Sequence, residues 1–312
     1  MLIVKNLSKS YNGREVVKEL NLSIEKGESF GLLGPNGAGK STTIGIISGL
    51  FSPDKGSVFV GGIDMLKDPK KAQQLIGIVP QEIALYPAMS AKENLMFWGR
   101  LYGLRGVVLK KQVSETLEII GLTDRAKDKV GEFSGGMKRR VNIGASILHN
   151  PKLLIMDEPT VGIDPQSRNH ILETVKLLNE KGMTIVYTSH YMEEVQLLCE
   201  RFGIVDHGEL IACGTIEELS KLVGDKKSVI LMLQEPFKDA TAVEDALIKR
   251  FPTSLIKVEN DKVIAFDPEP QQILSDLIQA TIEYGTKIAT VEIVEPNLES
   301  IFLHLTGRNL RN

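Results

Sequence analysis

The sequence predicts an α/β domain followed by a smaller α+β domain, and three observations support this. A strand-like run at residues 29–33 enters a glycine-rich loop, and an apolar stretch of helical spacing at 43–50 leaves it. A second apolar run of buried-strand length begins at residue 153 and ends in two carboxylates, Asp157 and Glu158. Beyond residue 220, strands and helices recur in a shorter rhythm. The length of 312 residues fits about two domains.

The loop reads G-P-N-G-A-G-K-S-T and contains the complete pattern G-x-x-x-x-G-K-[ST]. Its small residues let backbone N–H groups point at a polyphosphate, and the following helix directs its positive end at the same anion. Lys40 can reach the β- and γ-phosphates of ATP, and the Ser41 hydroxyl is placed to ligate Mg²⁺. A turn that merely caps a helix is the alternative. The expected ATP-binding residues are Gly34, Pro35, Asn36, Gly37, Ala38, Gly39, Lys40, Ser41 and Thr42.

The second apolar run ends at Asp157, and Glu158 follows it. We expect its strand to lie beside the strand that enters the loop, so that Asp157 approaches Mg²⁺ and Glu158 approaches the attacking water. Neighbouring residues of a strand point to opposite faces, so the two acids should have different roles. Asp157 is therefore predicted as a metal ligand and Glu158 as the base, with a solvated turn as the alternative.

A third motif, Ser134-Gly135-Gly136, precedes apolar residues at helical intervals. Ser134 is a natural N-cap, and the two glycines leave first-turn N–H groups uncovered, which makes a second anion site at a helix start. Met137 and three cations, 138–140, follow. A capped helix with an exposed basic face would explain the same residues.

Together these motifs resemble the nucleotide-binding cassette of ABC transporters. Gly162-Ile163-Asp164 and Thr188-Ser189-His190 follow in the family's order. The resemblance implies a nucleotide-binding domain at 1–222, with a RecA-like core, an N-terminal antiparallel β-subdomain and a helical subdomain at about 90–148. Met137, where related sequences often carry glutamine, and the segment 191–194 resemble drug- and antibiotic-export ATPases of the ABC-2 type more than importers.

The resemblance also implies roles for single residues. Tyr11 matches the aromatic residue that stacks on adenine, although a surface tyrosine would look the same. Gln81 matches the glutamine that reaches Mg²⁺ and the water, and Asp164 matches an acid that crosses between subunits. His190 matches the switch histidine that contacts the γ-phosphate. His190 also follows a strand-like run, 184–187, at the edge of the predicted sheet where ligands gather. The other four histidines are expected to be surface or capping residues.

The implied assembly is a head-to-tail homodimer, in which Ser134-Gly135-Gly136 of one subunit closes over ATP held by the other. The implied partners are integral membrane permease subunits, which would hold the chain at the cytoplasmic face of the membrane. An apolar cluster between Leu85 and Trp98 is expected either to pack as core or to form a groove for the permease.

Composition agrees with this and excludes other classes. No apolar run approaches the roughly 20 residues that span a bilayer, and the first residues lack a signal-peptide segment. The net charge is −3 and the basic cluster is local, so no nucleic-acid partner is expected. Cys199 and Cys213 form no C-x-x-C pair, and both are expected to be buried reduced thiols.

A polar joint at 222–227 leads to the predicted accessory domain, 228–307. Its order of strands and helices, βαββαβ, predicts a ferredoxin-like fold. A last helix at 297–305 carries Leu298, Ile301, Phe302 and Leu305 on one apolar face, which must be covered by other parts of the protein. The segment 295–302 resembles the ending of drug-export ATPases.

The leading hypothesis is the ATPase subunit of an exporter for a drug, antibiotic or lipid-like compound. A soluble ABC-type ATPase that acts on translation or DNA is the first alternative. The single cassette and the lack of a heptad run between Lys40 and Asp157 argue against it. An importer ATPase with a regulatory C-terminal domain stays open.

Overall fold

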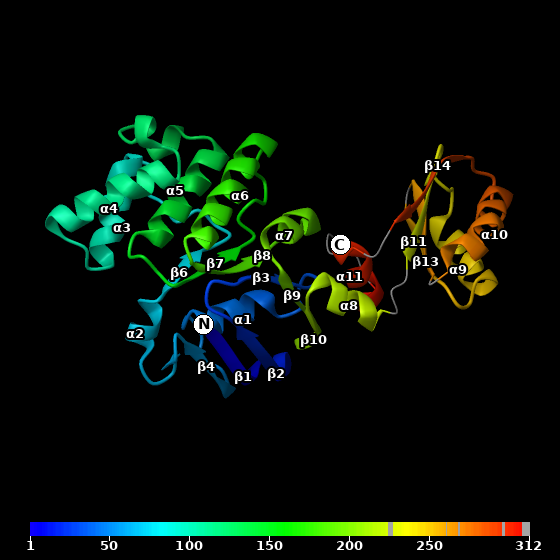
Figure 1. The fold of residues 1–312 in the computed structure, drawn as a ribbon, viewed down its shortest axis with the longest axis horizontal. Coiled ribbons are helices and arrows are strands. Elements are labelled where there is room, and N and C mark those ends of the chain that lie inside the picture. Colours follow the sequence, from blue (N-terminus) through cyan, green and yellow to red (C-terminus); the bar gives the residue numbers. More distant parts are fainter. Residues whose placement is uncertain (224–226, 260, 268, 295–296, 308–312) are drawn as a thin grey trace. The chain divides into compact units, whose positions relative to one another are not determined.

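The structure is a computed structural model that describes residues 1–223, 227–259, 261–267, 269–294 and 297–307. The described residues form two units, one within 1–213 and one within 214–307 (Figure 1). The middle of the predicted joint, 224–226, and residues 295–296 of the predicted ending lie outside the described residues.

The first unit begins with an antiparallel sheet in the order β2-β1-β4-β5. Its first two strands form a hairpin across Asn12-Gly13. Both turn residues have positive φ, 51° and 78°, which a two-residue type I′ turn requires and which Asn and Gly tolerate. The strands are β1 (Leu2–Tyr11), β2 (Arg14–Ile24), β4 (Lys55–Val60) and β5 (Ile63–Asp64).

A six-stranded sheet in the order β10-β9-β3-β8-β7-β6 forms the centre of this unit. Its pairs from β9 to β6 run parallel. The strands are β3 (Ser29–Leu33), β6 (Ile76–Val79), β7 (Leu153–Asp157), β8 (Thr184–Thr188), β9 (Arg201–Asp206) and β10 (Glu209–Gly214).

The strand order corrects one expectation. The strand that ends in Asp157 does not lie beside the strand that enters the loop, because β8 lies between them. The parallel strands nevertheless end at the same edge of the sheet, so the glycine-rich loop, Asp157 and the segment after β8 still meet there.

Helices surround this sheet. They include α1 (Lys40–Ile47), α2 (Pro69–Gln73), α6 (Pro165–Glu180) and α7 (Met192–Leu198). The segment between β6 and β7 is mostly helical, as predicted. Its helices α3 (Ala91–Leu101), α4 (Gly106–Ile119) and α5 (Gly135–Ile147) contact one another and enclose an apolar core of their own (Figure 1).

The second unit starts with α8 (Ile216–Leu222) and contains the predicted βαββαβ order. Its antiparallel sheet has the order β12-β13-β11-β14, and apolar side chains from the sheet, α9 and α10 form its core. The ferredoxin-like prediction is confirmed. The elements are β11 (Lys227–Leu233), α9 (Ala240–Arg250), β12 (Leu255–Glu259), β13 (Lys262–Asp267), α10 (Pro270–Glu283) and β14 (Ile288–Val294).

The last helix, α11 (Leu298–Thr306), follows the predicted pattern with one difference. Leu298, Ile301 and Phe302 are buried, as expected. Leu305 is only partly buried, whereas the neighbouring Leu303 is buried and packs with apolar residues of β13. The apolar face of the helix is therefore rotated slightly from the predicted one.

The two cysteines lie in different environments, which corrects the expectation that both are buried. Cys199 is buried, and burial raises the pKa of its thiol to about 12, whereas Cys213 is exposed. Because the thiolate is the reacting form, we expect a thiol reagent at about pH 8 to modify only Cys213 in the folded protein. Thiol titration before and after denaturation checks this, and a Cys213→Ser variant that still reacts when folded would contradict it.

Candidate nucleotide-binding site

A cavity of about 460 Å³ lies where the parallel strands end. The glycine-rich loop forms one wall, and side chains that follow β6, β7 and β8 approach from the other segments. The lining residues are Val16, Asn36, Gly37, Ala38, Gly39, Lys40, Ser41, Thr42, Gln81, Glu158, Val161 and His190.

Gly39 determines the shape of the loop where it enters α1. Its φ is 106°, and a Cβ atom there would lie 2.6 Å from the Val16 carbonyl oxygen, so a larger residue would distort the loop. Gly39 is also the N-cap of α1 and provides no side-chain hydrogen bond to the helix. The first turn of α1 therefore lacks a side-chain cap and is suited to an anionic ligand.

Lys40 is buried in the same cradle, with 7% of its surface exposed. Its ammonium donates hydrogen bonds to the carbonyl oxygens of Gly34 at 2.6 Å and Pro35 at 3.1 Å. Burial lowers the pKa of Lys40, and the charges of Glu158 and Asp157 oppose that shift. Neutral carbonyls are weaker partners for a cation than phosphate oxygens, so the ammonium is poised to bind a polyphosphate.

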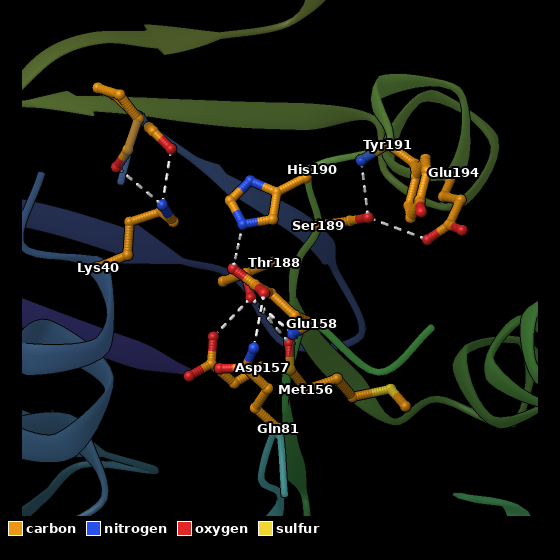
Figure 2. A network of polar contacts seen from close by, with 12 residues as sticks. Lys40, Gln81, Met156, Asp157, Glu158, Thr188, Ser189, His190, Tyr191 and Glu194 are labelled. Carbon is orange, nitrogen blue, oxygen red and sulfur yellow. Dashed lines mark hydrogen bonds and ion pairs between the residues drawn. The ribbon is translucent and has the colours of Figure 1, made fainter. Parts of the chain in front are cut away.

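Glu158 lies between Gln81 and His190 (Figure 2). The Gln81 amide donates to one carboxylate oxygen at 3.2 Å, and His190 Nε2 lies 2.6 Å from the other. Glu158 comes one residue after β7 and has a φ of 49°. This left-handed conformation, rather than the strand alternation we expected, directs its side chain, and such strain is common at functional sites.

Thr188, at the end of β8, bonds both the Asp157 carboxylate and the backbone of Glu158 at the end of β7. Its hydroxyl donates to Asp157 Oδ1 at 2.8 Å and accepts the Glu158 backbone N–H at 3.0 Å (Figure 2). A hydroxyl can do both at once. The sequence contained Thr188 within a motif, but a threonine at a strand end is ordinary and suggested no such role.

Glu194 on α7 is a second residue whose role the sequence did not reveal. It is buried, and one of its carboxylate oxygens accepts hydrogen bonds from Thr160 at 2.6 Å, Tyr187 at 2.9 Å and Ser189 at 3.0 Å. Burial and the nearby Glu194 charge raise the pKa of Tyr187 well above its ordinary value. Since Ser189 precedes His190, this network holds the backbone that presents the histidine.

The remaining predicted site residues do not line this cavity. Ser134 caps α5 as predicted, accepting the Met137 N–H at 3.2 Å. Asp164 caps α6, and the Ser167 backbone N–H that it accepts lowers the pKa of its carboxyl. Gly135 and Gly136 follow Ser134 in the first turn of α5. Tyr11 is 42% exposed at the end of β1.

The side chains expected to hold Mg²⁺ are Ser41, Gln81 and Asp157. Ser41 lines the cavity, Gln81 uses the N–H and not the oxygen of its amide for Glu158, and Asp157 uses one oxygen for Thr188. In the described part of the chain, no group of three or more His, Cys, Asp or Glu side chains could enclose a metal. Mg²⁺ bound to nucleotide takes most ligands from phosphates and water, so this small oxygen set fits it.

Comparisons with known proteins agree with the site. The profile of the family described as ABC transporter matches residues 17–161. The chain is 52% identical over 313 residues to the linearmycin resistance ATP-binding protein of Bacillus subtilis (strain 168), covering 100% of both. It is 36% identical over 308 residues to the Nod factor export ATP-binding protein I of Sinorhizobium fredii (strain NBRC 101917 / NGR234), covering 98% and 86%.

The fold also agrees with a solved dimeric ATP-binding cassette in a post-hydrolysis state with ADP and Pi. The TM-score is 0.62 at 29% identity, covering 69% of this chain and 98% of that one. A phosphate-binding loop, a carboxylate beside the cavity and relatives across the full length therefore lead to one assignment. The chain belongs to the ABC transporter family, as an ATP-binding subunit that hydrolyses ATP.

Proposed function

We propose that this chain drives the export of a drug, antibiotic or lipid-like amphipathic compound through a separate membrane permease. The observation that carries the proposal is the 52% identity, over the whole of both chains, with a relative named for linearmycin resistance. A second relative that matches nearly the whole chain is named for Nod factor export, which supports the outward direction.

In this proposal the loop 34–42 binds the phosphates of ATP, and Lys40 exchanges its carbonyl partners for phosphate oxygens. Glu158 takes a proton from the attacking water, while Gln81 and His190 hold the carboxylate in place. Ser41, Gln81 and Asp157 would hold Mg²⁺, which supplies positive charge against the phosphates when it is bound.

We also propose that Tyr11 stacks on adenine and that Ser134, Gly135, Gly136 and Asp164 act on ATP held by a second copy of the chain. The first turn of α5 lies outside the cavity of its own chain, and Ser134 and Gly135 at its start are exposed, whereas Gly136 is buried. A helix start with an exposed first turn is suited to an anion. A homodimer in which each α5 closes over the partner's ATP would use this otherwise unassigned site. The solved dimeric cassette of similar fold supports such pairing.

The permease is proposed to bind near the apolar cluster of α3. Leu85, Met96 and Trp98 pack against the core of the helical segment, whereas Tyr86 is 48% exposed and its ring meets that of Phe97 edge-on at 4.8 Å. Part of the cluster is therefore core, and its exposed aromatic edge is available to a partner.

No helix in the described part of the chain has the length and hydrophobicity that a bilayer crossing demands. We propose attachment to the cytoplasmic face through the permease. The proposed domain limits are 1–222 for the nucleotide-binding domain, with the helical subdomain at about 90–148, and 228–307 for the accessory domain.

Deletion of the gene tests the proposed cargo class. We expect the deletion strain to become at least about fourfold more sensitive to some amphipathic antibiotics, in a panel that includes linearmycin. The wild-type gene should restore resistance and a Glu158→Gln variant should not, because transport needs ATP turnover. Pull-down of the tagged chain should recover one multi-span membrane protein in stoichiometric amount.

A Cys213→Ser variant is the matched control, because Cys213 is exposed and the proposed mechanism does not use it. Unchanged sensitivity to the panel, together with recovery of ribosomes or DNA, would favour the soluble ATPase alternative. A deletion strain that fails to take up a nutrient would instead favour an importer.

A further inference from the structure

The cations after the third motif do not form the exposed basic face that the sequence allowed. Arg139 is 3% exposed, and Arg140 is partly buried. Burial lowers the pKa of both guanidinium groups. A cation that is taken out of water without a carboxylate partner is costly, so the position of Arg139 needs an explanation beyond solubility.

The guanidinium of Arg139 holds the backbone of the loop that follows β6. Its Nη1 donates to the Pro80 carbonyl oxygen at 2.6 Å, and its Nη2 donates to the Gln81 carbonyl oxygen. A planar guanidinium holds two successive carbonyls through two different nitrogens in a fixed geometry, which the single nitrogen of a lysine does not provide. Asn142, one turn further along α5, accepts the Ala84 N–H at 3.3 Å and tethers the same loop.

These contacts connect the tip of α5 to the carboxylate in the cavity. Ser134 caps α5, and Arg139 follows within the second turn of the same helix. Arg139 holds Gln81, and the Gln81 side chain donates to Glu158 at 3.2 Å. Because α5 is a rigid hydrogen-bonded element, a displacement of its first turn should displace Gln81 relative to Glu158.

We propose that Arg139 is a positioning residue that makes hydrolysis of the ATP held by its own protomer depend on the ATP of the partner. The inference rests on the proposed homodimer, in which the α5 tip of one protomer closes over the nucleotide of the other. Binding of the partner's ATP would fix the position of α5. Through the Arg139 guanidinium, this would fix the position of Gln81 relative to the Glu158 carboxylate that activates the water. Coupling between two binding sites requires a structural element that both sites contact or displace and that can adopt two arrangements.

Arg140 provides a matched control on the same helix. Its Nε donates to the Ile120 carbonyl oxygen at 2.7 Å and its Nη2 donates to the Gly121 carbonyl oxygen, at the end of α4. It therefore holds backbone carbonyls in the same way as Arg139 but is not joined to Gln81. If the variants of both arginines lose ATPase activity, the loss reflects reduced stability. If only the Arg139 variant loses it, the loss reflects coupling.

The test compares the full-length Arg139→Met, Arg139→Lys and Arg140→Met variants by ATPase rate over a range of ATP concentrations. We expect cooperative hydrolysis in the wild type. Arg139→Met should lower kcat about tenfold or more and reduce the Hill coefficient to about 1, with ATP affinity changed less than about twofold. Arg139→Lys should recover part of kcat. Arg140→Met should have the kcat and the Hill coefficient of the wild type.

Wild-type kcat and Hill coefficient in Arg139→Met would overturn the inference, and so would an equal loss in Arg140→Met. If Arg139→Met does not fold, Arg139→Lys decides by the same criteria, because it retains the charge. The homodimer is measured separately by light scattering of the Glu158→Gln variant with Mg-ATP. Failure to dimerise there would overturn the proposed function as well, whereas dimerisation with unchanged Arg139 kinetics would overturn the coupling alone.

Discussion

The Glu158→Gln variant is expected to hydrolyse ATP about 10²- to 10⁴-fold more slowly than the wild type while its ATP affinity changes less than about twofold. An amide has the shape of the carboxylate and can still bond Gln81 and His190, but it cannot take a proton from water. Among the residues that line the cavity, Glu158 is the only carboxylate. Blocked hydrolysis should also trap the proposed ATP-bound dimer.

Phosphate release gives the turnover rate, equilibrium titration gives the affinity, and light scattering gives the mass with and without Mg-ATP. Glu193→Gln is the matched control, because Glu193 is an exposed carboxylate in the first turn of α7 and contributes nothing to the cavity lining. Normal turnover in Glu158→Gln would show that another group activates the water.

The second large effect is expected for Lys40→Met, which should weaken ATP binding at least about tenfold and up to about a hundredfold. The loss reflects the missing charge-assisted bonds to phosphate. The stability of the folded protein should change in the opposite direction and stay the same or increase. Since burial depresses the pKa of Lys40 in the folded state, its ammonium costs folding free energy at every pH below that value. Replacing it with an apolar side chain of similar length should therefore keep or raise the melting temperature near neutral pH.

Calorimetric titration and thermal unfolding, each with and without Mg-ATP, separate these two effects. Lys152→Met makes the same substitution at an exposed lysine outside the cavity and should alter neither quantity. The wild type should be stabilised by ATP and Lys40→Met should not, because only a bound ligand shifts unfolding. An unchanged affinity, or a melting temperature lower by several degrees, would contradict the assigned environment of Lys40.

Local patterns in the sequence were sufficient for much of the fold. The Asn12-Gly13 turn needs only two residues that tolerate positive φ, and the phosphate-binding loop needs only small residues between a strand and a helix. The βαββαβ order of the second unit follows from short alternating segments. In each case the interactions that specify the structure lie within a few residues of one another.

Expectations that relied on distant parts of the chain were less successful. The alternation rule for Asp157 and Glu158 assumed that the strand continues, but the backbone turns to a φ of 49° at Glu158. The roles of Thr188 and Glu194 depend on hydroxyl and carboxylate groups that come together from separate segments. Nothing in the local composition around these residues distinguishes them from ordinary polar positions.

The sequence by itself determined which chemical groups are available for binding and hydrolysing a nucleotide, and the order in which strands and helices present them. Only the tertiary structure decided that β8 separates β3 from β7, that Gln81 and His190 both hold Glu158, and that Arg139 turns inward to the Gln81 loop. The physical reason is that short-range periodicity and turn propensity are written in consecutive residues. Sheet order and buried polar contacts are instead selected by the packing of the whole domain, where each buried donor and acceptor must find a partner.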